Sequence, residues 1–118
     1  MTSVTSQDLH DRIAGQNLPK RFLQNVARNG DIEVLNWKAA DGSWASKTLN
    51  EMAAVVARLT AALKDLGVAR GDKVVMMIRN RQEFHALDTA VLFCGATPVS
   101  IYNSSAPDQI QYLINDCG

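Results

Sequence analysis

The chain has 118 residues, of which 47% are hydrophobic and 20% are charged, a composition typical of one ordinary folded domain. Basic and acidic residues number 12 each, so the net charge is zero and bulk electrostatics give no support to a nucleic-acid or acidic-membrane partner. The apolar runs are too short to span a membrane, and the amino terminus lacks the basic start and apolar core of a signal peptide. A cytoplasmic location is therefore expected.

The first part of the chain is predicted to contain one short helix. Residues 1–17 are polar and show no clear periodicity, so we interpret them as an arm with about one helical turn. From Pro19 onwards, apolar side chains recur at helical spacing, at Phe22, Leu23, Val26 and Ala27. Asn29-Gly30 follows, a pair suited to a left-handed helix cap.

A hairpin and a long helix come next. The β-prone segments 32–37 and 43–47 flank a turn containing Asp41-Gly42, which predicts a small antiparallel ribbon because glycine accepts positive φ. Thr48 and Glu51 have the spacing of a capping box, so a helix is expected to start there. Its buried stripe is predicted to comprise Met52, Val55, Val56, Leu59, Leu63 and Leu66, with Gly67 as the C-terminal cap.

The segment from Lys73 to Tyr102 is predicted to be a βαβ unit. Its first strand, 73–78, contains five successive apolar residues, which is typical of a strand buried on both faces and places Met76 and Met77 in the core. In the crossover helix, Asn80 and Glu83 are predicted to cap the start, Phe84, Leu87 and Val91 to form the stripe, and Gly95 to end it. The second strand, 97–102, is expected to lie parallel to the first.

A last helix is predicted to begin near Ser105, which would serve as its cap, with Pro107 and Asp108 in the first turn. Ile110, Leu113 and Ile114 would form its buried face. The fold class is therefore α/β, with a partial doubly wound parallel sheet and a small antiparallel ribbon. Only two parallel strands are visible, so the domain is expected to be incomplete, with 1–17 as the arm and 18–118 as the subdomain.

The carboxyl ends of the two parallel strands are the first candidate site, because open α/β sheets bind ligands at that edge. The candidates there are Arg79-Asn80 and the loop Tyr102-Asn103-Ser104-Ser105. An anion could lie beside Arg79 and Arg81, although solvated surface residues fit the pattern better. His85 lacks converging ligands for a metal, and the two serines lack a basic partner for nucleophilic catalysis. Cys94 and Cys117 are interpreted as reduced thiols.

The order and spacing of several segments resemble the amino-terminal part of the adenylate-forming acyl-CoA synthetases. The likeness covers residues 18–118. It rests on Asp41-Gly42-Ser43-Trp44, the helix start at Thr48, Leu66-Gly67-Val68, Gly71-Asp72-Lys73-Val74, Asn80 with Glu83, Gly95-Ala96-Thr97-Pro98-Val99-Ser100-Ile101-Tyr102, and Pro107-Asp108-Gln109-Ile110. Residues 100–107, followed by Gln109-Ile110-Gln111-Tyr112, look most like the long-chain fatty acid branch, of an actinobacterial type.

The resemblance implies an enzyme that uses ATP and Mg²⁺ to join a fatty acid to CoA through an acyl-adenylate, releasing AMP and pyrophosphate. It also implies that Tyr102, Asn103 and Ser104 form a loop beside the CoA nucleotide, although a purely structural turn fits these residues as well. The family's phosphate loop and its C-terminal domain with the catalytic lysine have no counterpart here; neither G-x-G-x-x-G nor G-x-x-x-x-G-K-[ST] occurs. The 118 residues alone are therefore expected to be inactive, to bind none of these cofactors and to hold no metal or catalytic residue.

Two other functions remain open. The chain could be a non-catalytic interaction module that pairs its open sheet with another chain, for instance one carrying the missing remainder of the enzyme. A free-standing nucleotide-binding domain is the third hypothesis, and it would require a glycine loop that the sequence lacks.

Overall fold

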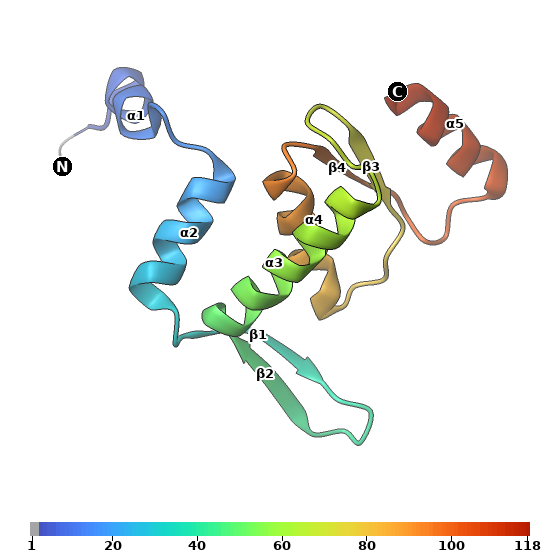
Figure 1. The fold of residues 1–118 in the computed structure, drawn as a ribbon, viewed down its shortest axis with the longest axis horizontal. Coiled ribbons are helices and arrows are strands. Elements are labelled where there is room, and N and C mark those ends of the chain that lie inside the picture. The colour runs from blue at the N-terminus through green and yellow to red at the C-terminus, as the bar shows by residue number, and fades with distance from the viewer. Residues whose placement is uncertain (1–2) are drawn as a thin grey trace.

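The computed structural model describes residues 3–118 and shows five helices and four short strands in those residues (Figure 1). The mixed α/β class is as predicted. The elements, in chain order, are α1 Ser6–Ile13, α2 Leu18–Asn29, β1 Glu33–Lys38, β2 Trp44–Thr48, α3 Leu49–Asp65, β3 Lys73–Met76, α4 Gln82–Phe93, β4 Thr97–Ser100 and α5 Pro107–Cys117.

The core lies where α3 packs against α4. Small side chains on α4, Ala86 and Ala90, let the two helices approach closely. They meet Leu49, Met52 and Val56 of α3. Helix α2 adds an aromatic edge, because the rings of Phe22 and Phe93 meet edge to face with centroids 5.8 Å apart. A second buried cluster of Val91, Cys94 and Ala96 joins α4 to the start of β4.

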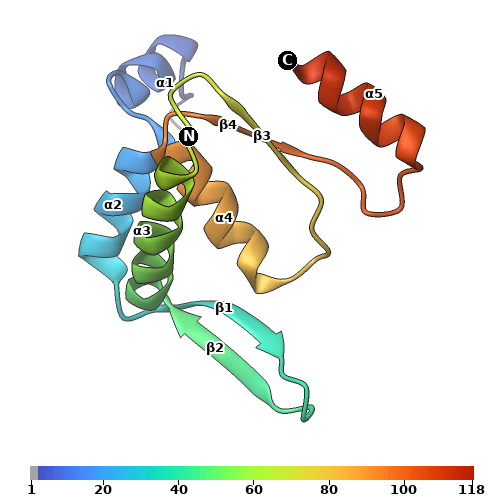
Figure 2. The same cartoon turned by 45° about the vertical axis from the view of Figure 1, so that its right-hand side comes forward.

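Strands β3 and β4 pair in parallel, which confirms the predicted βαβ unit. Their register runs from Lys73 opposite Thr97 to Met76 opposite Ser100, so each strand ends two residues earlier than predicted. The prediction that Met77 lies in the core is wrong: Met76 is 3% exposed but Met77 is 50% exposed. Successive side chains point to opposite faces of a strand, and helices α3 and α4 cover only one face of this pair (Figure 2).

Strands β1 and β2 form the predicted antiparallel ribbon, which extends away from the helices (Figure 2). Gly42 has φ of +84° in the connecting turn, as the Asp-Gly pair predicts. The turn is held by Asp41, whose carboxylate accepts hydrogen bonds from the hydroxyl of Ser43 at 2.7 Å and from its N–H at 2.9 Å. These bonds lower the pKa of Asp41.

The predicted capping of α3 is confirmed. The hydroxyl of Thr48 accepts a hydrogen bond from the Glu51 N–H at 3.2 Å, and the Glu51 carboxylate accepts one from the Thr48 N–H at 2.8 Å. Gly67 lies beyond the helix end with φ of +94° and donates its N–H to the carbonyl of Lys64. Leu66 was predicted on the buried stripe but is 82% exposed, because it is the cap residue and lies past the last packed turn.

Three other predictions about helix ends are wrong. Helix α4 has Arg81 rather than Asn80 at its N-cap position, without a capping hydrogen bond from the side chain, and the Glu83 carboxylate pairs with the Arg81 guanidinium. In α5 the cap is Ala106 rather than Ser105, and the Gln109 side chain accepts from the Ala106 N–H at 3.0 Å.

Gly30 is not left-handed; its φ is −55°. A Cβ at this position would overlap the amide end of the exposed Asn50 side chain, so that side chain would have to move.

The buried stripe of α4 also differs from the prediction. Of its three predicted members only Val91 is fully buried, while Phe84 and Leu87 are half-buried. Ala86 and Ala90 contact α3 instead. Each of these alanines comes one residue before a member of the predicted stripe, Leu87 or Val91. Gly95 ends the helix as predicted, with φ of +74°.

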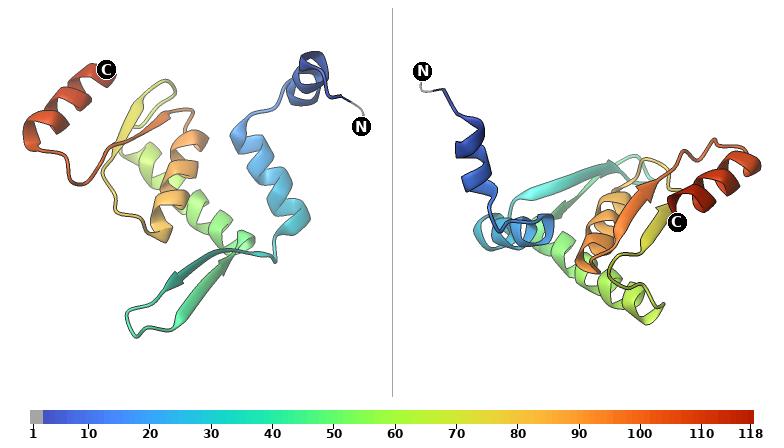
Figure 3. Two further views of the ribbon diagram at one scale, coloured as in Figure 1. Left: turned by 180° about the vertical axis from the view of Figure 1, so that it is seen from behind. Right: turned by 90° about the horizontal axis from the view of Figure 1, so that it is seen from above.

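The two ends of the described chain pack against little else (Figure 3). Helix α1, predicted as about one turn, has eight residues and a capping box between Thr5 and Asp8. The predicted buried face of α5 is wrong for this chain: Leu113 is 37% and Ile114 47% exposed, and Ile110 is half-buried, because α5 meets no extensive surface within residues 3–118. The radius of gyration is 17.2 Å, against about 13 to 14 Å for a compact domain of this length.

Candidate functional site

The carboxyl ends of β3 and β4 meet at one edge of the sheet, and a hollow of about 400 Å³ lies there. It is lined by Ile78, Arg79, Asn80, Phe84, Ser100, Ile101 and Tyr102. The structure therefore brings residues from both strand ends together at the edge where the sequence places the candidate site. Arg79 and Asn80 follow β3, and Tyr102 follows β4. Asn103 and Ser104 line neither this hollow nor the next one along the chain.

Tyr102 stands between two hollows. Its side chain is 82% exposed and also lines a space of about 480 Å³ against α5, formed with Ser105, Asp108, Gln109, Tyr112 and Leu113. The carbonyl of Tyr102 accepts a hydrogen bond from the Ser105 N–H at 3.1 Å, which closes a turn around Asn103 and Ser104. The turn presents an aromatic ring, an amide and a hydroxyl to solvent, groups that can stack on a planar ligand and hydrogen-bond it.

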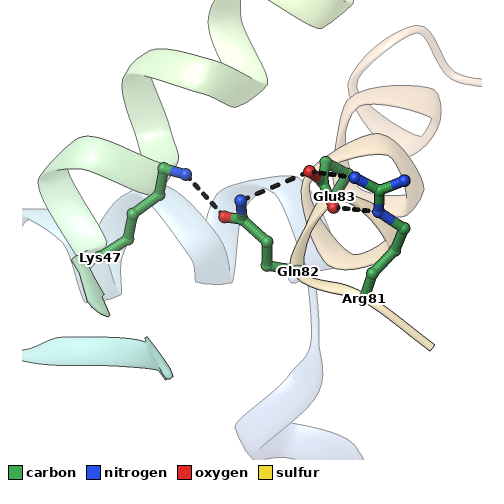
Figure 4. Close-up of polar contacts among 4 residues, drawn as sticks. All are labelled: Lys47, Arg81, Gln82 and Glu83. Atoms are coloured by element: carbon green, nitrogen blue, oxygen red, sulfur yellow. Dashed lines mark hydrogen bonds and ion pairs between the residues drawn. The ribbon is translucent and has the colours of Figure 1, made fainter. Parts of the chain in front are cut away.

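Arg81 is committed to a neighbouring carboxylate (Figure 4). Its guanidinium forms a two-pronged pair with Glu83, at 2.7 Å from Nε and 3.0 Å from Nη2. The hydrogen bond raises the pKa of Arg81 and, together with the nearby positive charge, lowers the pKa of Glu83. Arg79 forms no ion pair within residues 3–118, so it is the cation left at the hollow.

The same turn of α4 is tied to the ribbon. The Oε1 atom of Gln82 accepts a hydrogen bond from Lys47 Nζ at 2.6 Å, and Gln82 Nε2 donates to Glu83 at 3.4 Å (Figure 4). Lys47 Nζ also lies 4.7 Å from the centre of the Trp37 ring, within cation–π range. The sequence gives no signal for this link, because Lys47 and Gln82 are 35 residues apart and neither belongs to a motif.

The other sequence candidates carry no converging chemistry. His85 is exposed, with its ring edge to face with Phe84 at 5.7 Å, and residues 3–118 contain no group of three His, Cys, Asp or Glu side chains that could hold a metal. Neither Ser104 nor Ser105 is hydrogen-bonded through its side chain to a base in that part of the chain. Both cysteines are free thiols as predicted, Cys94 buried and Cys117 half-buried. No helix of residues 3–118 is both long and apolar enough to cross a membrane.

Residues 22–118, more than four-fifths of the chain, match the family of AMP-binding enzymes. The chain belongs to this family. It is 35% identical over 107 residues to the long-chain-fatty-acid–CoA ligase FadD15 of Mycobacterium bovis, covering 91% of this chain and 17% of that protein. It is 42% identical over 71 residues to the uncharacterized protein Rv1549 of Mycobacterium tuberculosis, covering 60% of this chain and 41% of that one.

Among solved structures, this chain resembles the inhibitor-bound N-terminal domain of FACL13 from Mycobacterium tuberculosis. The TM-score is 0.74 at 23% sequence identity, covering 85% of this chain and 24% of that one. These findings confirm the predicted resemblance to the amino-terminal part of a long-chain fatty acid CoA synthetase and the predicted fold class. The chain spans between 17% and 41% of the length of these two curated relatives.

Proposed function

We propose that this chain supplies the amino-terminal part of a cytoplasmic long-chain fatty acyl-CoA ligase, with residues 1–17 as an arm and 18–118 as an incomplete subdomain. In the whole enzyme, ATP, fatty acid and CoA would give acyl-CoA, AMP and pyrophosphate, so the chain would serve lipid metabolism. The observation that carries the proposal is the 35% identity to FadD15 across 91% of the chain.

The 118 residues do not fit ATP with Mg²⁺. The sequence contains no glycine-rich phosphate loop, and the described residues contain no cluster of carboxylates or imidazoles that could hold a metal. We therefore propose that the chain alone is inactive and binds none of the cofactors by itself. In this proposal, ATP and its metal are held by the remainder of the enzyme.

The chain's own contribution would be the loop beside the CoA nucleotide. Tyr102 offers an exposed ring on which adenine can stack, and Asn103 and Ser104 offer an amide and a hydroxyl for ribose or phosphate oxygens. Bound CoA supplies the thiol that accepts the acyl group. The loop would orient the nucleotide end of CoA and take no part in proton or bond transfer.

A chimera tests both parts of this proposal. This chain replaces the matching segment of FadD15, and acyl-CoA formation from ATP, a long-chain fatty acid and CoA is measured for the chimera and for the chain alone. We expect activity only in the chimera. Acyl-CoA formed by the chain alone would overturn the proposed inactivity, and a folded chimera that forms no acyl-adenylate would overturn the ligase assignment.

The Tyr102→Ala variant of the chimera tests the CoA loop. Stacking on an aromatic ring contributes about 1 to 3 kcal/mol per base, so the KM for CoA should rise about fivefold to about one-hundredfold. Acyl-adenylate formation, which precedes CoA, should not change. Trp44→Ala is the matched control, because Trp44 is 72% exposed and lies at the ribbon, away from the loop. An unchanged KM in Tyr102→Ala would leave the loop as a structural turn.

A second candidate function is that of a non-catalytic interaction module, and the exposed surface favours it. The described structure exposes 8662 Å², about 2,400 Å² more than a compact monomer of 12.9 kDa. A standard interface covers only about 800 Å² per partner. If this function holds, the chain mixed with a separately produced remainder of FadD15 should sediment as one complex; two independent species would rule it out.

A further inference from the structure

Charge is separated along this chain even though the total is zero. Residues 12–30 contain four basic residues, Arg12, Lys20, Arg21 and Arg28, and no acidic residue. All 12 acidic residues and the other 8 basic residues lie elsewhere, so the rest of the chain has a net charge of −4 against +4 here. The neutral total therefore conceals a basic segment, which is the segment that joins α1 to α2 and continues through α2.

Apolar side chains are exposed among these cations. A hollow of about 460 Å³ lies between α1 and α2 and is lined by Leu9, Arg12, Ile13, Gln16, Asn17, Leu18 and Arg21. The three aliphatic side chains are 52%, 64% and 66% exposed, in chain order. We define Leu9, Arg12, Ile13, Leu18 and Arg21 as the α1–α2 face. Helices α1 and α2 lie on the side of the molecule away from α5 (Figure 3).

The acidic residues nearest this face do not line it. Asp8 is bonded to Thr5 at the start of α1, and Asp11 accepts a hydrogen bond from Gln7 at 2.8 Å. Arg28 extends the basic character, because it lines the adjoining hollow on the other side of Leu18 and Arg21. Asp88 of α4 also lines that hollow and is the one carboxylate there.

We propose that the α1–α2 face binds the surface of an anionic lipid bilayer. An interfacial segment needs exposed aliphatic side chains that enter the acyl boundary and basic side chains that reach the headgroups, and both kinds line this one hollow. An acidic protein surface is a less suitable partner for this face than a lipid surface. It would pair with the arginines but would leave the exposed side chains of Ile13 and Leu18 in water. This inference does not depend on the proposed ligase function.

The experiment is flotation of the 118-residue chain with vesicles, either of phosphatidylcholine alone or of equal parts phosphatidylcholine and phosphatidylserine. We expect binding to the anionic vesicles only. Each basic residue near an anionic surface is worth about a fivefold gain in binding, so the triple variant R12Q/R21Q/R28Q should bind about one-hundredfold more weakly. The matched control R58Q/K64Q/R70Q removes three exposed cations from elsewhere and should bind like the parent chain.

A second variant separates lipid insertion from charge alone. At about 1 M salt the charges are screened, so the parent chain should bind only through its exposed aliphatic side chains. The I13S/L18S variant keeps the basic residues but should lose this remaining binding. Circular dichroism of each variant establishes that it remains helical. The proposal is overturned if the parent chain does not float with anionic vesicles, if it binds both vesicle types equally, or if R58Q/K64Q/R70Q loses as much binding as R12Q/R21Q/R28Q.

Discussion

Helices α3 and α4 at the centre of the molecule pack against each other through apolar side chains. The terminal helices α1 and α5 also carry apolar side chains, but neither contains a buried residue. In the centre, Val56 of α3 and Ala90 and Val91 of α4 are 2%, 0% and 0% exposed. At the ends, α1 buries no residue and α5 leaves Ile114 at 47% exposure. An amphipathic pattern therefore predicts that a helix forms, but not that its apolar face is covered within the same 118 residues.

Truncating one side chain in each region tests this contrast most strongly. Leu49→Ala should lower the free energy of unfolding by about 2 to 5 kcal/mol, because Leu49 is 3% exposed and its loss leaves a cavity beside Met52 and Ala86. Ile114→Ala, on the exposed face of α5, should change it by less than about 0.5 kcal/mol. Urea unfolding followed by circular dichroism measures both. Equal losses would mean that α5 packs on the body in solution.

A second effect concerns the join between α2 and α3. Gly30→Ala should destabilise the chain by about 0.5 to 1.5 kcal/mol, because the new Cβ would displace the exposed Asn50 side chain from its hydrogen bond with Asp31 at 3.1 Å. In an Asn50→Ala background, the same change should stabilise by about 0.4 to 1 kcal/mol, since Gly30 has helical φ and alanine restricts the unfolded chain. The sign reversal is the result to look for. A Gly30→Ala penalty that persists without Asn50 would show that the backbone, rather than this contact, requires glycine.

The contrast also explains which parts of the fold can be predicted from sequence. The ribbon turn at Asp41-Gly42, the capping box at Thr48 and the parallel pairing of β3 with β4 depend on neighbours a few residues apart or on a connection rule, and all are confirmed. Met77 and Ile114 were predicted to be buried from local pattern alone. Their exposure depends on what covers the second face of the sheet and the face of α5, which no local pattern records.

The candidate site divides in the same way. Chain connectivity is enough to bring Arg79, Asn80 and Tyr102 to one hollow, because parallel strands end at one edge. The Lys47–Gln82 hydrogen bond could not be predicted, since its partners are 35 residues apart and meet only when the base of the ribbon lies beside the start of α4. The close approach of Asn50 to Gly30 is similar: the glycine suggested a left-handed cap, and only the packed structure shows that the Asn50 side chain lies where a Cβ would be.

Removing the N-terminal capping threonine from the central helix α3 and from the terminal helix α1 should change stability by different amounts, both smaller than for Leu49→Ala. Thr48→Ala should cost about 0.5 to 2 kcal/mol of global stability, because α3 carries the core and its cap bond is lost. Thr5→Ala removes an equivalent capping box from α1 and should leave the urea midpoint unchanged. Hydrogen exchange at the first turn of each helix would report both losses locally. A shift of the midpoint by Thr5→Ala would show that α1 is coupled to the body.

The smallest expected effect is a change of α1 with pH. Hydrogen bonds from the Thr5 hydroxyl and N–H lower the pKa of Asp8 below its ordinary value of 3.8. The carboxylate of the folded helix therefore holds its proton less tightly than that of the unfolded segment, so its contribution is complete above about pH 4 and is lost as pH falls through the lowered pKa. Cα chemical shifts of α1 should move toward coil values in that window, while those of α3 do not.

Asp8→Asn should abolish the change. Asp41→Asn, which removes another aspartate whose pKa is lowered by hydrogen bonds from a neighbouring serine, should leave the response of α1 intact. A transition in α1 that survives Asp8→Asn would assign the acid sensitivity of this terminal helix to another group, and one that appears simultaneously in α3 would mean that the ends and the centre unfold together.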